Sequence, residues 1–259
     1  GTVFLVKDAV SKKKYAAKEC HKEIKQYDPN LEDDEKDQVI DLYREIKIMS
    51  ALDHPSIVRF VGYNPLNLYG DPYLTFIYEY VPNGTLHKFA KKESEMKISD
   101  TILLINMYGI ASGMSFLHKH KIVHRDLKLE NVLLDSKSYP KITDFGLAKM
   151  FESNISSMNI QSRSGIKGSP LFIAPEVIEF AKYSNSSDVY SFGFMVYILM
   201  TRQYPFQNLT LKKLFEKILN GERPSIPETI PSSYKKLIEN CWAQNPKVRP
   251  SFDDIMKSL

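Results

Sequence analysis

The chain has 259 residues, of which 43% are hydrophobic and 25% are charged, and its net charge is +4 at pH 7. This balance is that of a globular protein with enough apolar sequence for one or two domains. The charge is too small, and too interspersed with acidic residues, to argue for a nucleic-acid partner. The densest basic runs, residues 12–14 and 91–92, are short and favour solvated loop faces.

Cysteine usage and apolar patterning predict a reduced, intracellular protein, which we expect to be cytoplasmic. Cys20 and Cys241 lie far apart, so they indicate neither a disulfide framework nor a zinc cluster. The longest apolar run, residues 189–200, is interrupted by Ser191 and Gly193 and is shorter than the roughly 20 residues that span a bilayer. We therefore expect a buried core helix there and no membrane segment. The chain begins with glycine and shows no signal peptide, which indicates a fragment.

The first 80 residues are predicted to be rich in strands, with one helix. Four β-like runs are separated by polar segments, at residues 3–6, 15–20, 57–63 and 74–80. Between the second and third runs, apolar residues recur at three- and four-residue spacing over residues 34–52, which predicts a helix. Beyond the turn at Val81–Gly84, helices are predicted over residues 100–120, 185–202, 210–220, 232–243 and 251–258.

A dense group of polar residues lies between His124 and Gly146, in the sequence HRDLKLENVLLDSKSYPKITDFG. Four of them sit at the ends of apolar runs: Asp126, Lys128, Asn131 and Asp144. Burying such groups without partners costs several kcal/mol, so we expect them in loops that face a cleft.

A second charged pair is predicted in the N-terminal part. Glu45 falls on the apolar stripe of its helix, where a carboxylate needs a partner. Lys18 is the natural partner, and in a strand it shares one face with Ala16 and Cys20. Small Ala16 leaves room for a flat ligand beside the ammonium. Taken alone, the pair could equally be an ordinary solvent-exposed ion pair.

Several motifs, in order along the chain, together resemble a eukaryotic protein kinase. Tyr15–Lys18 resembles the family's lysine motif, His124–Asn131 its catalytic loop, Asp144–Gly146 its magnesium motif and Ala174–Glu176 the end of its activation segment. The resemblance covers essentially all 259 residues. It implies an α+β, bilobal fold with a small antiparallel β-rich lobe that carries one helix and a larger, mainly helical lobe. We expect the first lobe at residues 1–80, a hinge at 81–84 and the second lobe at 85–259.

The resemblance implies a role for each polar residue. Asp126 would accept or orient the proton of an attacking hydroxyl, and Lys128 would steady the charge of the γ-phosphate of ATP. Asn131 and Asp144 would hold Mg²⁺, while Lys18, oriented by Glu45, would hold phosphate oxygens. For Asp126 and Asn131 the alternative is loop capping by their side chains.

The nucleotide would contact a further set of positions. The resemblance places adenine against the backbone of Glu79–Val81, with Tyr78 narrowing the back pocket. The expected cofactor-binding residues are Gly1, Val3, Ala16, Lys18, Glu79, Val81, Leu133 and Asp144.

Other matches are expected to support the fold. His124, Phe145, Met49 and Phe60 match the family's regulatory hydrophobic stack, although all four could be plain core residues. Asp188 is expected to precede the buried helix and to bond the catalytic-loop backbone. Glu176 and Arg249 resemble the family's buried ion pair.

The sequence also bears on which hydroxyl is phosphorylated. Lys128 and Gly168–Pro170 resemble serine/threonine kinases, and Ser169 is expected to contact Asp126 and Lys128. Residues 187–193 and 241–252 resemble the tyrosine-kinase-like group. A serine/threonine enzyme of that group fits both, and dual specificity stays open.

Regulation is expected to involve Arg125, beside the catalytic aspartate. Phosphorylation near Ser164 or Ser162, by an activating kinase or by autophosphorylation, would order the loop through this arginine. Alternatively, these serines are flexible-loop filler.

One family motif is incomplete. Gly1 and Val3 resemble the end of the glycine-rich loop, and the first two glycines and the strand before them are absent. We therefore expect weak ATP binding and lower stability than in a longer chain.

The leading hypothesis is a protein serine/threonine kinase that uses ATP and Mg²⁺, and the alternative is a pseudokinase or scaffold module. A small-molecule phosphotransferase is disfavoured by Ala174–Glu176 and the loop before it.

Overall fold

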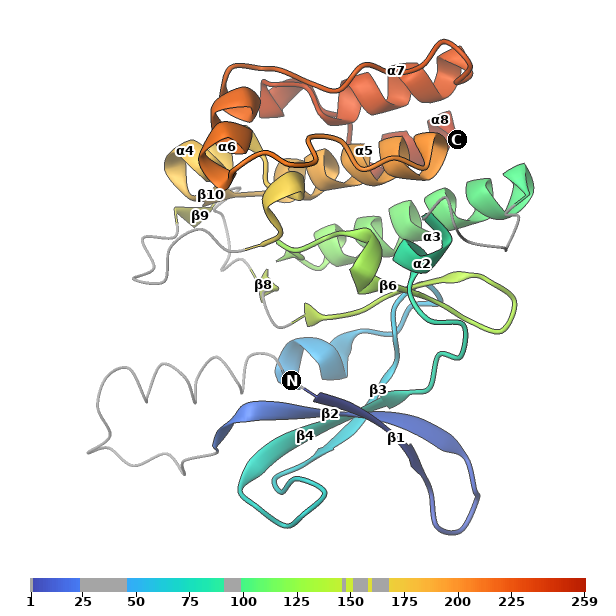
Figure 1. The fold of residues 1–259 in the computed structure, drawn as a ribbon. Helices are drawn as coiled ribbons and strands as arrows, with labels where there is room; N and C mark the ends of the chain where they lie inside the picture. Colours follow the sequence, from blue (N-terminus) through green and yellow to red (C-terminus); the bar gives the residue numbers. More distant parts are fainter. Residues whose placement is uncertain (1, 24–45, 91–98, 146–147, 151–157, 160–167) are drawn as a thin grey trace. The chain divides into compact units, whose positions relative to one another are not determined.

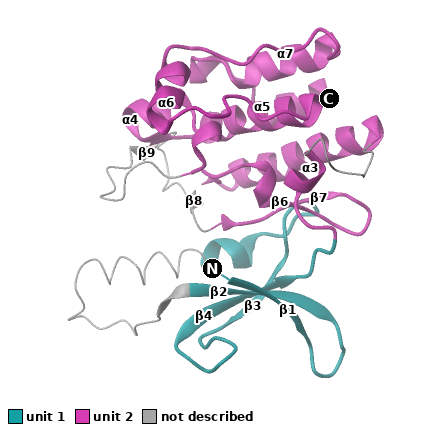
Figure 2. Cartoon of the chain, viewed as in Figure 1, with its two compact units in different colours: residues 1–82 teal, residues 83–259 magenta. Residues whose placement is uncertain are grey.

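The computed structural model describes residues 2–23, 46–90, 99–145, 148–150, 158–159 and 168–259. The chain divides into two compact units, residues 1–82 and 83–259 (Figure 2). The boundary falls at Pro82, within the segment 81–84 that the sequence singles out. Gly1, Glu45, Ser162 and Ser164 lie outside the described residues, so the predictions that depend on them stay predictions.

Unit 1 is built on a four-stranded antiparallel sheet with the order β1-β2-β4-β3 (Figure 1). Its strands are β1 (Thr2–Lys7), β2 (Lys14–Glu23), β3 (Phe60–Asn64) and β4 (Tyr73–Glu79). The alternation of strand side chains puts Ala17, fully buried, on one face and Ala16 with Lys18 on the other. Residues 46–51 are helical, which agrees with the end of the predicted helix 34–52.

Unit 2 is mainly helical and carries three small two-stranded sheets. Its helices are α2 (Leu86–Ala90), α3 (Asp100–Lys119), α4 (Pro175–Phe180), α5 (Asn185–Thr201), α6 (Leu211–Leu219), α7 (Ser232–Cys241) and α8 (Phe252–Ser258). The strand pairs are β5 (Ile122–Val123) with β8 (Lys149–Met150), β6 (Val132–Leu134) with β7 (Pro140–Ile142), and β9 (Met158–Asn159) with β10 (Lys182–Tyr183). An antiparallel sheet in one unit and helices in the other confirm the α+β fold class.

Helix α5 is the core helix of unit 2. Its residues from Ser187 to Leu199 are all buried. Ser184 begins the helix with a capping box that it shares with Ser187, so the first backbone N–H groups have partners. Gly193 lets α7 approach closely, because a Cβ there would lie only 2.9 Å from the Cβ of Cys241. The prediction of a buried helix at residues 189–200 is confirmed.

Helix α3 bears on the expectation of no membrane segment. It has 20 residues, and by length and composition alone it is able to cross a membrane. The expectation rested on the shorter run at residues 189–200 and did not consider this helix. Met107, Ile110 and Met114 on α3 are nonetheless fully buried, and α3 packs against α8 and β7. A core helix passes the same test of length and composition, so the finding is weak evidence for a membrane span.

Candidate active site

The segment from His124 to Asn131 is anchored to the core helix by one carboxylate. Asp188 accepts hydrogen bonds from the backbone N–H groups of His124 and Arg125, both at 2.9 Å. His118 Nε2 lies 2.9 Å from the same carboxylate, whose side chain is only 1% exposed. Asp188 lies within the first turn of α5 rather than before the helix, and its predicted bond to the loop backbone is confirmed. This anchor holds Arg125 in a left-handed conformation, with φ of 70°.

Four hydrogen-bond donors surround the Asp126 carboxylate. Its Oδ2 accepts from Asn131 Nδ2 at 3.0 Å and from Lys128 Nζ at 2.8 Å. Its Oδ1 accepts from the N–H of Ser169 at 3.0 Å and from the Ser169 hydroxyl at 3.1 Å. A carboxylate offers about four acceptor positions, so these contacts fill them. An incoming hydroxyl must therefore displace one of the four, and the Ser169 hydroxyl is the neutral donor that rotates away most easily.

Lys128 joins Asp126 to Ser169. Its ammonium donates to Ser169 Oγ at 2.7 Å as well as to Asp126. The predicted contacts of Ser169 with both residues are confirmed. An ammonium has three donors, and two of them are used here. Among the described residues the third donor has no partner, so it is open to an anionic oxygen that approaches the Asp126 carboxylate.

Gly168 makes the approach of Ser169 possible. Its φ is +112°, a conformation that L side chains rarely adopt. A Cβ at this position would lie 3.0 Å from the carbonyl oxygen of Arg125. The backbone of the 168–169 segment therefore packs directly on the catalytic loop, which a larger residue would prevent.

Asn131 and Asp144 are brought together by backbone pairing. The N–H of Thr143, which directly precedes Asp144, donates to the carbonyl of Asn131 at 2.9 Å. Asn131 Nδ2 donates to the carbonyl and the carboxylate of Asp126, which turns its Oδ1 away from these partners and leaves it to act as a ligand. Asp144 has φ of 66°, so its backbone is in the left-handed region.

This donor set fits Mg²⁺. A carboxylate and an amide oxygen are hard ligands, and Mg²⁺ is commonly held by one or two protein oxygens together with substrate phosphates. Among the described residues, no group of three or more His, Cys, Asp or Glu side chains forms a metal site of another kind. Asn131 and Asp144 would hold the ion, and the remaining ligands would come from the nucleotide.

Two members of the predicted hydrophobic stack meet in unit 2. The rings of His124 and Phe145 have their centroids 5.3 Å apart, and His124 Nε2 lies 3.1 Å from the carbonyl of Thr143. Met49 and Phe60 belong to unit 1, where Met49 is buried and Phe60 packs edge-on against the ring of Tyr78 at 5.7 Å. Two members of the predicted stack therefore belong to each unit, and among the described residues only His124 and Phe145 are seen in contact with each other.

Three of the expected nucleotide residues of unit 1, Val3, Ala16 and Lys18, share one face of its sheet. Val3 lies directly opposite Lys18 across the β1–β2 pair, and Ala16 lies opposite Tyr78 across the β2–β4 pair. The N–H of Glu79 is committed to the sheet, because it donates to the carbonyl of Arg59 at 3.0 Å. Any adenine bond from Glu79 would thus use its carbonyl oxygen.

Two further expected positions, Val81 and Leu133, belong to different units. Val81, in unit 1, is buried, and Leu133 lies in β6, where it forms an isolated bridge with Thr85. The predicted partner of Lys18, Glu45, lies outside the described residues, so their pairing stays a prediction.

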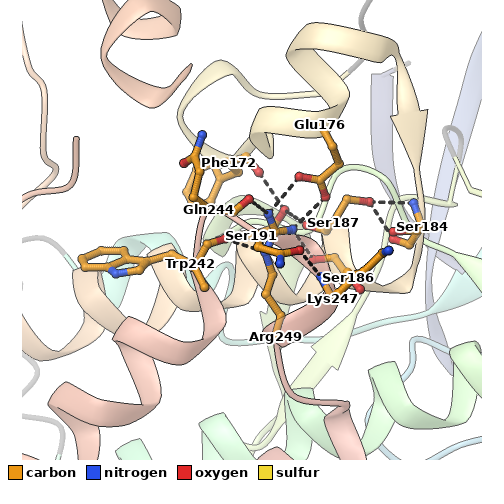
Figure 3. Close-up of polar contacts among 12 residues, drawn as sticks. Phe172, Glu176, Ser184, Ser186, Ser187, Ser191, Trp242, Gln244, Lys247 and Arg249 are labelled. Atoms are coloured by element: carbon orange, nitrogen blue, oxygen red, sulfur yellow. Dashed lines mark hydrogen bonds and ion pairs between the residues drawn. The ribbon is translucent and has the colours of Figure 1, made fainter. Parts of the chain in front are cut away.

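A buried ion pair supports the segment that follows Ser169. Arg249 donates two parallel hydrogen bonds to the Glu176 carboxylate, at 2.7 and 2.8 Å (Figure 3). The Arg249 side chain is fully buried and also donates to the carbonyls of Ser186 and Ala243. The predicted pair is confirmed. Its guanidinium lies 5.0 Å from the ring centroid of Tyr190, so the aromatic face contributes to holding the cation.

Sequence reasoning missed three contributors to the site. His118 supports the Asp188 anchor, and Tyr183 in β10 lies beneath the guanidinium of Arg125, with 4.3 Å between the guanidinium carbon and the ring centroid. Gly168 was grouped with its neighbours and given no role of its own. Only Gly168 carries a sequence signal, since a glycine beside a catalytic segment suggests close backbone approach.

A carboxylate that orients a hydroxyl, a neighbouring ammonium and two oxygen ligands define a phosphoryl-transfer type of site. A family model described as protein tyrosine and serine/threonine kinase matches residues 1–259. The chain belongs to this protein kinase family.

Individual relatives agree with the family. The chain is 39% identical over 225 residues to pats1 of Dictyostelium discoideum, described as a probable serine/threonine-protein kinase. The aligned residues are 83% of this chain and 7% of that protein. It is 35% identical over 227 residues to serine/threonine-protein kinase CTR1 of Arabidopsis thaliana, and the alignment covers 86% of this chain and 27% of CTR1. It is 31% identical over 221 residues to serine/threonine-protein kinase STY17 of the same plant, and the alignment covers 83% of this chain and 36% of STY17. The chain thus spans little more than a third, or much less, of these relatives.

Proposed function

We propose that this chain is the catalytic domain of a protein serine/threonine kinase, which transfers the γ-phosphoryl group of ATP to serine or threonine hydroxyls of protein substrates. The observation that carries the proposal is the closed set of contacts among Asp126, Lys128 and Ser169. It brings a carboxylate, an ammonium and a hydroxyl to one point beside two oxygen ligands. The relatives named as serine/threonine kinases support the same choice of acceptor.

In this proposal Asp126 receives the acceptor hydroxyl. The Ser169 hydroxyl stands where an acceptor hydroxyl would donate to Oδ1, so a substrate serine or threonine can replace it without rebuilding the loop. Lys128 then offers its remaining donor to the transferred group. The side-chain amide of Asn131 fixes the position of Asp126, because it donates to the backbone carbonyl of Asp126 and to its carboxylate Oδ2. Positioning and charge stabilisation of this kind account for most of the rate gain in phosphoryl transfer.

The nucleotide and metal complete the proposed reaction. ATP with Mg²⁺ would supply the phosphoryl group and neutralise its developing charge. Asn131 and Asp144 would hold the metal ion, and Lys18 with Glu45 would hold the phosphates. The adenine would lie against Val3, Ala16 and the hinge backbone.

Regulation and location remain part of the proposal. Arg125 would receive a phosphate on Ser162 or Ser164, and its stacking on Tyr183 supports a fixed position for that guanidinium. Membership of the tyrosine-kinase-like group, a protein substrate and a cytoplasmic location also stay predictions.

The test is a radiolabelled ATP assay against libraries of serine, threonine and tyrosine peptides. The matched control is Asp144→Asn, because asparagine tolerates the left-handed backbone at this position and removes only the negative charge. We expect transfer to serine and threonine that the substitution lowers at least about a hundredfold. Transfer to tyrosine alone would contradict the acceptor class. Absence of transfer that depends on Asp144, in a chain extended upstream, would favour the scaffold alternative.

A further inference from the structure

The connection between β1 and β2 is exposed along its whole length. Residues 7–14, which we call the lysine hairpin, connect β1 to β2 (Figure 1) and are all exposed. Val10, near the middle of the connection, is 90% exposed. A single exposed apolar side chain is common in proteins, so Val10 gains meaning only from the charges beside it.

The charges of the lysine hairpin are not balanced. It carries four lysines, Lys7, Lys12, Lys13 and Lys14. Lys7 and Lys14 lie directly opposite each other across the strands, an arrangement that destabilises a hairpin. Within the described residues no lysine of the hairpin pairs with a carboxylate. The one acid, Asp8, accepts a hydrogen bond from the Ser11 hydroxyl at 2.7 Å, and with its charge included the hairpin keeps a net charge of +3, four lysines less one aspartate.

The lysine hairpin is also preorganised. Asp8 and Lys13 are bonded through their backbones at 2.9 Å, and Lys12 has φ of 59°. The ammonium of Lys13 lies 5.6 Å from the ring centroid of Tyr15. The ammonium of Lys12 donates to the carbonyl of Ala9, the residue before Val10, at 2.7 Å. These local contacts order the turn before any partner arrives, so binding would require little further ordering.

The shape of the hairpin discriminates between anionic partners. Small anions are usually held in concave sites, whereas this feature is an exposed turn with an apolar side chain near its middle. A fluid lipid surface accepts an exposed turn, because the apolar side chain enters the headgroup region while lysines contact anionic headgroups. We propose that the lysine hairpin binds an anionic lipid surface. This site is independent of the proposed kinase activity and replaces the interpretation of residues 12–14 as a merely solvated face.

Co-sedimentation with vesicles tests the proposal. The whole chain would be mixed with vesicles of phosphatidylcholine, or of an equal mixture of phosphatidylcholine and phosphatidylserine. We expect binding only to the mixed vesicles, weakened by added salt. Lys12→Glu combined with Lys13→Glu should lower the partition coefficient at least about twentyfold, since each lysine near such a surface contributes about fivefold. Val10→Asp should lower it several-fold.

Matched controls lie on unit 2. Lys212→Glu with Lys213→Glu reverses two exposed lysines of α6, and Val248→Asp replaces a valine that is 64% exposed. Neither should change vesicle binding, and thermal melts should show that every variant is folded. Equal loss in the controls would overturn the proposal, as would equal binding to both vesicle types. Binding of a poly-glutamate peptide without vesicle binding would assign the hairpin to an acidic protein partner instead.

Discussion

At the scale of single residues, the position before Ser169 decides whether the proposed site can form. Gly168 has a backbone conformation that other residues rarely adopt, and its Cα faces the carbonyl of Arg125. The adjoining Asp126 is the proposed catalytic carboxylate. A change at Gly168 is therefore expected to affect geometry as well as stability.

We predict that Gly168→Ala lowers kcat at least about tenfold, because the added methyl displaces the Arg125 carbonyl and with it Asp126. The strained backbone should also cost about 1–3 kcal/mol of stability. Gly221→Ala is the matched control: its φ of +79° imposes strain, while its Cβ would meet only Gln244 Oε1 at 3.9 Å. Steady-state kinetics and urea denaturation of both variants provide the check. A similar loss of kcat in both would contradict the geometric role.

The sequence predicts these residues better than it predicts their contacts. The motif order identifies Asp126, Lys128 and Asn131 because the chemistry requires those groups at that spacing. The resemblance also predicts the contacts of Ser169 with Asp126 and Lys128. The support from His118 and Tyr183 could not be foreseen, because their partners lie 70 and 58 positions away in the chain and neither residue belongs to a motif.

At the scale of elements, the ion pair between Glu176 and Arg249 fixes α4 to the chain before α8. We predict that Arg249→Leu lowers the free energy of unfolding by about 3–5 kcal/mol, because it leaves the Glu176 carboxylate buried without its partner. Chemical denaturation measures the change. Lys212→Ala, which removes an exposed pair with Glu216 at 3.9 Å, should change stability by less than about 0.5 kcal/mol. An Arg249 effect as small as this control would show that the pair contributes little.

The elements that the sequence predicts are the long ones. Helices α3, α5, α6, α7 and α8 fall within a residue or two of the predicted ranges. Helix α5 is predicted by its long apolar run, since it is buried on all sides, and the short helix α8 has only seven residues. Helices α2 and α4 have five and six residues, too few for a period to appear. The pairs β5–β8 and β9–β10 have two residues per strand, and only the tertiary fold brings them together.

At the scale of the whole molecule, nucleotide binding is expected to raise the free energy of unfolding and therefore the Tm. A ligand at a hundred times its Kd stabilises a protein by about 2.7 kcal/mol, which raises the Tm of a chain of this size by roughly 5–10 °C. We predict such a shift with ATP and Mg²⁺ together, and its reversal by chelation of the metal ion. Differential scanning fluorimetry measures it. Asp144→Asn should remove the dependence on Mg²⁺, and an unchanged dependence would argue against Asp144 as a ligand.

The bond of Asp188 to the catalytic loop has a consequence for cooperativity. The amides of His124 and Arg125 are bonded to a carboxylate that belongs to the buried helix α5. They can exchange their hydrogens with water only when the loop separates from that helix. An irregular segment thereby becomes part of the same cooperative unit as the core. The chain can vary its surface loops without loosening the segment that carries Asp126.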